Sequence, residues 1–185
     1  MENNVIIAGF GGQGVLLAGE VLANALMLDE KNVTWFPCYG AEMRGGTVNC
    51  EVVSSEAEVS SVNKKEADFI IALNQLSFER FLPKLKKGGW IIANSSLVKE
   101  LRSRIDVNYL FAPITNLAND LGEIRISNII SLGMLAKVSK LTSVETLHKA
   151  LDSVLPEHRK NLLALNLKAL EAGFNFQPTQ AAVCS

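Results

Sequence analysis

The feature that most constrains the fold is a strand-like run that passes through a glycine-rich turn directly into an apolar helix. Val5 to Ala8 is short and apolar and is bounded by glycine, which is typical of a strand buried on both faces. The turn Gly9 to Gly14 (GFGGQG) follows at once. Val15 to Leu28 then has apolar residues around most of its circumference, which predicts a largely buried helix. The chain therefore begins with a strand–turn–helix unit of the α/β class.

The same alternation continues along the chain. Further strands are predicted at Val33 to Phe36, Thr47 to Val53, Asp68 to Leu73, Trp90 to Ala93 and Val107 to Ala112. Helices are predicted at Ser77 to Leu85, Asn116 to Asp120, Asn128 to Val138, after the capping box Thr142 to Glu145, and at Pro156 to Ala172. With no linker or repeat, we predict one domain over residues 1–185: a three-layer α/β sandwich with a largely parallel or mixed sheet and a helical C-terminal third.

Several local signals make this prediction more specific. Pro37 is expected to end the second strand. Lys86 to Gly89 are expected to end the helix predicted at Ser77 to Leu85. The alternation within Thr47 to Val53 gives that strand one wetter side, which carries Asn49, Glu51 and Val53. The tail Phe174 to Ser185 shows no periodicity.

Composition excludes several classes of function. A formal net charge of -1 argues against a nucleic-acid binder, and no apolar run approaches the length of a membrane span. Without a CxxC pair or a secretory signal, Cys38, Cys50 and Cys184 offer no metal site and indicate a reduced, cytoplasmic setting. Cys38 and Cys50 are interpreted as buried structural thiols, and His148 and His158 as surface residues, so no catalytic set is predicted.

The first turn fits G-x-G-x-x-G at Gly9, Gly11 and Gly14, between a strand and a helix whose N-terminus would present free N–H groups to an anion. A dinucleotide fold also requires an acid at the end of the second strand, and Trp35 to Cys38 contains none. Three interpretations remain from the motif: a nicotinamide or flavin dinucleotide, another phosphate-bearing ligand, and a purely structural turn.

The second turn, Tyr39 to Thr47 (YGAEMRGGT), places the cation of Arg44 beside the bare backbone of Gly45 and Gly46. This arrangement suits phosphate or carboxylate, although a hairpin with a solvated or Glu42-paired Arg44 is the alternative. Small polar residues also follow two other strands, at Asn74-Gln75 and Asn94-Ser95. Ligands of open α/β sheets collect at such strand ends.

The two turns together resemble the gamma subunit of 2-oxoacid:ferredoxin oxidoreductases, the pyruvate and 2-oxoglutarate ferredoxin oxidoreductase family. The resemblance rests on Ile6 to Ala25 (IIAGFGGQGVLLAGEVLANA) and on Tyr39 to Cys50 (YGAEMRGGTVNC). It extends through Asn128 to Leu135 (NIISLGML) and Asn166 to Gly173 (NLKALEAG), so it covers nearly the whole chain.

The resemblance implies a non-autonomous subunit, with the domain known as the pyruvate/ketoisovalerate oxidoreductase catalytic domain. Such enzymes decarboxylate a 2-oxoacid on thiamine diphosphate, reduce ferredoxin or a similar acceptor, and release an acyl-CoA. Thiamine diphosphate, Mg and [4Fe-4S] clusters are implied to be carried mainly by the partners, namely alpha, beta and ferredoxin-like delta subunits. Of the 2-oxoacids, 2-oxoglutarate is our choice over pyruvate, branched-chain acids and indolepyruvate.

The same resemblance assigns this chain's two loops to the junction of coenzyme A and thiamine diphosphate. The residues implied to bind are Gly11, Gly12, Gln13, Gly14, Arg44, Gly45, Gly46 and Thr47. Gln13 is expected to be a hydrogen-bonding side chain at the loop tip, and Arg44 to contact an anion, either a phosphate of coenzyme A or a carboxylate of a partner subunit. Tyr39 and Glu42 are interpreted as shaping the turn or an interface. Two alternatives stay open: a free-standing Rossmann-type nucleotide-binding oxidoreductase, and a purely structural assembly subunit.

Overall fold

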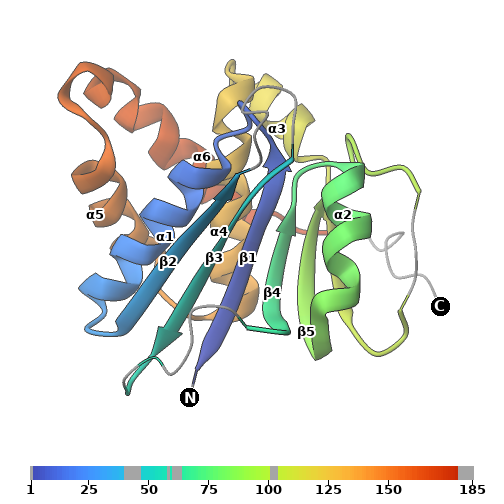
Figure 1. The fold of residues 1–185 in the computed structure, drawn as a ribbon. Coiled ribbons are helices and arrows are strands. Elements are labelled where there is room, and N and C mark those ends of the chain that lie inside the picture. The colour runs from blue at the N-terminus through green and yellow to red at the C-terminus, as the bar shows by residue number, and fades with distance from the viewer. Residues whose placement is uncertain (1, 40–46, 58, 60–63, 101–103, 179–185) are drawn as a thin grey trace.

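A computed structural model describes residues 2–39, 47–57, 59, 64–100 and 104–178. Its centre is a six-stranded sheet in the order β2-β3-β1-β4-β5-β6 (Figure 1). The strands are β1 (Asn3–Phe10), β2 (Asn32–Tyr39), β3 (Thr47–Ser55), β4 (Ala67–Ala72), β5 (Leu85–Asn94) and β6 (Asn108–Ala112). β1, β4, β5 and β6 run parallel, whereas β3 is antiparallel to both of its neighbours, so the sheet is mixed and mostly parallel.

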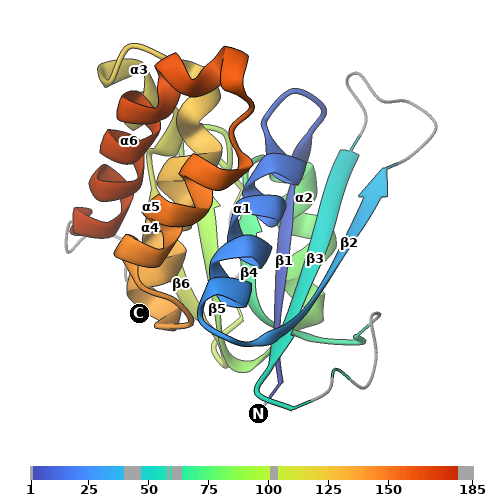
Figure 2. The same ribbon diagram turned by 90° about the vertical axis from the view of Figure 1, so that its left-hand side faces the viewer.

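Helices cover both faces of this sheet. They are α1 (Val15–Leu28), α2 (Gln75–Phe81), α3 (Ile114–Asp120), α4 (Ser127–Ser139), α5 (Val144–Val154) and α6 (Leu163–Asn175). α1 and α4 pack on one face, with α5 against α1 and α6 against α4 (Figure 2). α2 packs on the other face, against β1 and β4. The predicted three-layer α/β sandwich with a helical C-terminal third is confirmed.

Two hydrophobic cores follow from the alternation of side chains along the strands. Val5 and Ile7 of β1 face the core under α1 and α4, and Ile6 and Ala8 face the smaller core under α2. Each is fully buried, so β1 is apolar throughout because it has a helical layer on each side.

The crossing of α4 and α6 depends on two glycines. A Cβ at Gly133 would overlap the carbonyl oxygen of Leu170, and a Cβ at Gly173 would overlap the carbonyl oxygen of Ile130. The two helix backbones therefore touch directly at this crossing, which no side chain larger than hydrogen permits.

Two predicted boundaries are wrong for identifiable reasons. β2 continues through Pro37 to Tyr39, because β2 is an edge strand with β3 as its only partner in the sheet and an edge tolerates a missing N–H. The helix before β5 ends at Phe81, where a 3-10 turn over Leu82–Lys84 contains Pro83, and Lys86 to Gly89 belong to β5.

The last long helix also differs from its prediction, since Glu157–Leu162 form 3-10 turns and the α-helix begins only at Leu163. In the capping box of α5 the N-cap is Ser143, whose hydroxyl accepts from the backbone N–H of Thr146 at 3.0 Å. The cap lies one residue later than the spacing of Thr142 and Glu145 predicts.

The wetter side predicted for β3 is wrong. Asn49, Glu51 and Val53 do share a face, but β3 lies between β2 and β1, and all three residues are buried. Glu51 is 6% exposed and its Oε2 has no hydrogen-bond partner. Desolvation raises the pKa of the Glu51 carboxyl, and the charge of Lys84, the Lys64 main chain and the Asn4 amide only partly oppose this.

We expect Glu51→Gln to stabilise the protein at neutral pH by about 1 kcal/mol, because it removes a poorly compensated buried charge. At a pH just above 4.5, the usual pKa of a glutamate, the Glu51 carboxyl keeps its proton in the folded wild type but loses it in the unfolded chain. Wild-type stability therefore falls as pH rises from that value through the raised pKa, and the variant lacks this slope. Thermal unfolding at pH 5 and pH 8 measures the difference.

Glu56→Gln is the matched control, since Glu56 is exposed in the turn after β3 and the same change there should leave the melting temperature unaltered. A Glu51→Gln protein that melts at or below the wild-type temperature at pH 8 contradicts this account of the carboxyl.

Candidate functional site

The polar loops meet at the edge of the sheet where β1, β4 and β5 end. The helix after β1 packs on one face and the helix after β4 packs on the other, so the connections diverge between these two neighbouring strands. In open α/β sheets this divergence leaves a crevice in which ligands bind. The expectation that Gly9 to Gly14, Asn74 and Asn94 gather at strand carboxyl ends is confirmed.

The glycine loop between β1 and α1 shows what its glycines are needed for. Gly9 lies in β1, and a Cβ there would come within 2.7 Å of Gln13 Oε1 and 2.9 Å of a Val15 methyl. Gly12 and Gly14 have φ of 99° and 71°, the left-handed region that other residues enter at a cost. Gly9 therefore makes room for the Gln13 side chain, and the two later glycines turn the chain into α1.

The Gln13 side chain points back into the loop. Its Oε1 accepts from the backbone N–H of Phe10 at 2.6 Å and from Asn74 Nδ2 at 3.1 Å. Its Nε2 donates to the carbonyl oxygen of Leu73 at 3.4 Å. The amide thus joins the end of β1 to the end of β4, and it keeps one N–H for any further contact.

The first turn of α1 keeps its backbone N–H groups free of side-chain caps. Gly14 is the N-cap and makes no side-chain hydrogen bond, and the first turn contains no acidic residue. A helix of 14 residues that begins in this way presents N–H donors and the positive end of its dipole at this edge of the sheet. This geometry fits a phosphate or carboxylate group.

Asn128 is a site residue that the sequence reasoning did not identify. It lies in the first turn of α4 and is 1% exposed, and its Nδ2 donates to the carbonyl oxygen of Gly14 at 2.9 Å. Its Oδ1 is buried without a hydrogen-bond partner. The sequence shows only an asparagine directly before Ile129 and Ile130, which by itself indicates neither burial nor a contact with Gly14.

The second turn ends beside the first, where Thr47 pairs with Phe10. Its candidate residues Arg44, Gly45 and Gly46 lie outside the described residues. Thr47 is described: it is the register partner of Phe10, and its hydroxyl accepts from Arg80 Nη1 at 3.3 Å. The strand that follows the second turn therefore begins directly opposite the residue that precedes Gly11.

The order of the strands in the sheet is not that of a dinucleotide-binding fold. In that fold the second strand lies beside the first, so that an acid at its end reaches the ribose. Here β3 separates β1 from β2, and the last four residues of β2, Phe36 to Tyr39, include no acid. Both observations argue against a nicotinamide or flavin dinucleotide at Gly9 to Gly14.

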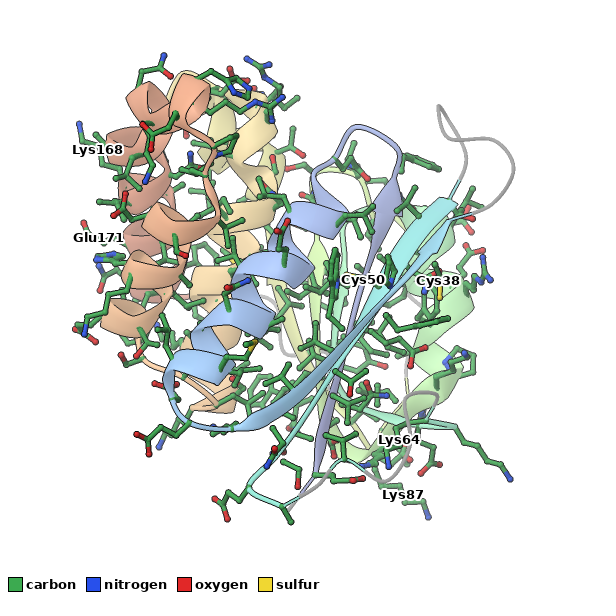
Figure 3. The ribbon with its side chains drawn as sticks, turned by 60° about the vertical axis from the view of Figure 1, so that its left-hand side comes forward. Cys38, Cys50, Lys64, Lys87, Lys168 and Glu171 are labelled. Atoms are coloured by element: carbon green, nitrogen blue, oxygen red, sulfur yellow. The ribbon has the colours of Figure 1, made fainter. Side chains whose placement is uncertain are left out.

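The cysteines and histidines lie away from the glycine loop or are enclosed. Cys50 is fully buried against α1, and burial raises the pKa of its thiol to about 12. Cys38 is only partly buried and lies on the opposite side of the β2–β3 hairpin, so the interpretation as a buried thiol holds for Cys50 alone (Figure 3). His158 is exposed, whereas His148 is partly buried, with Nε2 4.0 Å from Glu171 Oε1.

Two hollows of the described surface lie apart from the glycine loop. One of about 240 Å³ lies beside Asn4 and the Lys86–Asp68 ion pair, and one of about 530 Å³ is lined by Lys31, Lys140 and Thr142 among others. Neither is lined by a residue of the glycine loop. In the described part of the chain, no three His, Cys, Asp or Glu residues gather as metal ligands. No helix in these same ranges has the length and hydropathy needed to cross a membrane.

Comparison with known proteins gives a consistent set of relatives. Residues 4–176 match the family model of pyruvate ferredoxin/flavodoxin oxidoreductases. The 2-oxoglutarate synthase subunit KorC of Methanocaldococcus jannaschii is 32% identical, over 90% of this chain and 91% of its own. The ketoisovalerate oxidoreductase subunit VorA of Methanothermobacter thermautotrophicus is 36% identical, over 93% of this chain and 36% of its own.

Solved structures agree with these relatives. The gamma subunit of a keto/oxoacid ferredoxin oxidoreductase from Geobacter sulfurreducens PCA superposes with a TM-score of 0.83 at 31% identity, over 94% of this chain and 95% of that chain. A 2-oxoglutarate:ferredoxin oxidoreductase from Magnetococcus marinus, solved with 2-oxoglutarate, coenzyme A and succinyl-CoA, shares the fold at a TM-score of 0.84 and 23% identity, over 94% of this chain and 30% of that chain. The chain belongs to the pyruvate ferredoxin/flavodoxin oxidoreductase family and is built like its separate gamma subunit.

Proposed function

We propose that this chain is the gamma subunit of a multi-subunit 2-oxoacid:ferredoxin oxidoreductase, with residues 1–185 as one domain. The observation that carries the proposal is the likeness to a separate gamma subunit over 95% of that chain's length. The partners are alpha and beta subunits and a ferredoxin-like delta subunit, ferredoxin or a similar protein accepts the electrons, and the complex works in the cytoplasm.

In this proposal the glycine loop faces coenzyme A at a junction with the thiamine diphosphate of the partner subunits. The uncapped first turn of α1 and the backbone of Gly11, Gly12 and Gly14 suit a phosphate of coenzyme A. Gln13 holds the loop, and we assign Arg44, Gly45, Gly46 and Thr47 to the same ligand. Coenzyme A supplies the thiol that accepts the acyl group, and this chain binds and orients it.

The proposal gives this chain no catalytic residue. Thiamine diphosphate, Mg and the [4Fe-4S] clusters are assigned to the partner subunits, because the described residues of this chain bring together no ligand set for a metal. The amides and glycines at the strand ends can position a ligand, but they cannot supply a nucleophile or a base.

For the substrate we propose 2-oxoglutarate. The 2-oxoglutarate synthase subunit of Methanocaldococcus jannaschii is 32% identical and is matched over 91% of its own length. Branched-chain 2-oxoacids are the second candidate, because the ketoisovalerate oxidoreductase relative has the higher identity, 36%.

The test is reconstitution with the partner subunits encoded beside this chain. Coenzyme A-dependent reduction of a viologen dye is measured with 2-oxoglutarate, pyruvate, 2-oxoisovalerate and indolepyruvate. We expect activity only when this chain is present, with the highest kcat/KM for 2-oxoglutarate. Equal activity without the chain contradicts the proposed role, and saturable binding of NAD or FAD by the chain alone would favour the Rossmann-type alternative.

Arg44→Ala distinguishes a ligand-binding role from purely structural assembly. A contact between Arg44 and an anionic group of coenzyme A predicts a KM for coenzyme A raised by about tenfold or more. Arg125→Ala is the matched control, since Arg125 forms an exposed ion pair with Glu123 that should not affect the reaction. Full activity of the Arg44→Ala complex would favour the structural alternative.

A further inference from the structure

Four amide side chains lie beneath and beside the glycine loop, although they come from four separate places in the chain. They are Gln13 of the loop, Asn74 after β4, Asn94 at the end of β5 and Asn128 in the first turn of α4, and we name them the strand-end amide network. Asn74, Asn94 and Asn128 are 2%, 1% and 1% exposed. Burying an amide is unfavourable unless its polar atoms find partners, so these positions need an explanation.

The inner half of the network converges on one carbonyl oxygen. Leu73 O accepts from Gln13 Nε2 at 3.4 Å and from Asn94 Nδ2 at 3.3 Å. Asn94 is itself fixed on its other sides, since Nδ2 also donates to Thr115 Oγ1 at 2.8 Å and Oδ1 accepts from the backbone N–H of Thr115 at 3.2 Å. The end of β5 and the start of α3 are thereby connected to the side chain that holds the loop.

The outer half of the network fixes the other end of the loop. Gly14 O accepts from Asn128 Nδ2 at 2.9 Å and from the backbone N–H of Ala18 at 3.0 Å. A Cβ on Gly14 would lie 2.5 Å from Asn128 Nδ2, so the two residues are in close contact. Asn128 Oδ1 remains a buried acceptor without a hydrogen-bond partner among the described residues.

We infer that Asn94 and Asn128 are positioning residues for the glycine loop, acting through Leu73 O and Gly14 O. The network fixes the loop backbone before a ligand arrives, so that its N–H groups need no reorganisation on binding. This inference rests on the proposed function, because the ligand it positions the loop for is coenzyme A.

The first experiment needs no ligand. Hydrogen exchange of the hydrogen-bonded backbone amides of Phe10, Gln13 and Ala18 is followed in the full chain, for wild type, Asn94→Ala and Asn128→Ala. Asn128→Ala removes the bond to Gly14 O, and Asn94→Ala removes a bond to Leu73 O, the acceptor that Gln13 also uses, so we expect these amides to exchange about tenfold faster. Asn116→Ala is the matched control: Asn116 is exposed at the same edge and bonds only to Ser96 among the contacts of its side chain.

The second experiment uses the assembled complex. We expect both variants to raise the KM for coenzyme A by about tenfold while the KM for the 2-oxoacid stays unchanged. A general loss of stability would lower activity without raising the KM for coenzyme A selectively over the KM for the 2-oxoacid. Asn94→Ser and Asn128→Ser are measured in the same way should an alanine variant fail to fold.

Loop exchange at the wild-type rate in both variants overturns the inference, and so does a KM for coenzyme A that does not change. A wild-type complex without coenzyme A-dependent activity would instead refute the proposed function, and the exchange experiment would still decide whether the network holds the loop.

Discussion

Gly173→Ala should unfold or severely destabilise the protein, by about 3 kcal/mol or more, with a melting temperature about 10 °C lower. The added Cβ would overlap the carbonyl oxygen of Ile130, and the carbonyl belongs to helix backbone that cannot move alone. Relief requires α4 and α6 to separate, which exposes the apolar side chains packed between them, including Ile130 and Leu170. Thermal and urea unfolding of the purified chain measure the loss.

Gly88→Ala controls for the substitution itself. Gly88 has φ of 75° and nothing lies within 4 Å of its Cβ position, so alanine there incurs backbone strain without overlap, about 1 kcal/mol. A Gly173→Ala protein as stable as Gly88→Ala would show that the two helices do not touch as described.

Gly14→Ala should reduce the coenzyme A-dependent activity of the assembled complex by about 100-fold. Two independent causes act at this position. The backbone has φ of 71°, and the new Cβ would lie 2.5 Å from Asn128 Nδ2 and 2.8 Å from its Cγ. Alanine must therefore distort the N-cap of α1 and displace the side chain that holds Gly14 O. The measurement is kcat/KM for coenzyme A in the reconstituted complex.

Gly122→Ala is the control for backbone strain alone. Gly122 has φ of 89° and open space at its Cβ position, and it lies after α3, outside the glycine loop. It should lose some stability and keep its activity. Wild-type kcat/KM in the Gly14→Ala complex would mean that the loop conformation does not matter for the reaction.

Much of the fold was predictable because the buried strands consist almost entirely of apolar residues. β1, β4 and the core of β5 are apolar runs bounded by glycine or polar residues, and α1 has the predicted bounds, Val15 to Leu28. The place of β3 was not predictable in the same way. Its alternation of apolar and polar residues indicates one wet face, whereas its insertion between β1 and β2 buries Glu51 as well. Sheet order depends on long-range pairing, which local pattern does not encode.

The candidate site shows the same division. The glycine loop and the asparagines after β4 and β5 were visible because each directly follows a strand. Asn128 was not, because its partner Gly14 lies 114 residues earlier in the chain. The inward direction of the Gln13 amide was equally hidden, since it depends on the space that Gly9 leaves free. Residues that hold a loop from a distant element are found only once the elements are assembled.

The central claim is that this chain supplies half of a coenzyme A site that its partner subunits complete. Calorimetric titration of coenzyme A tests it most directly, with three samples: this chain alone, the complex lacking this chain, and the full complex. The account predicts saturable binding by the full complex and at least about tenfold weaker binding by either part. Equal affinity in the complex that lacks this chain would contradict it.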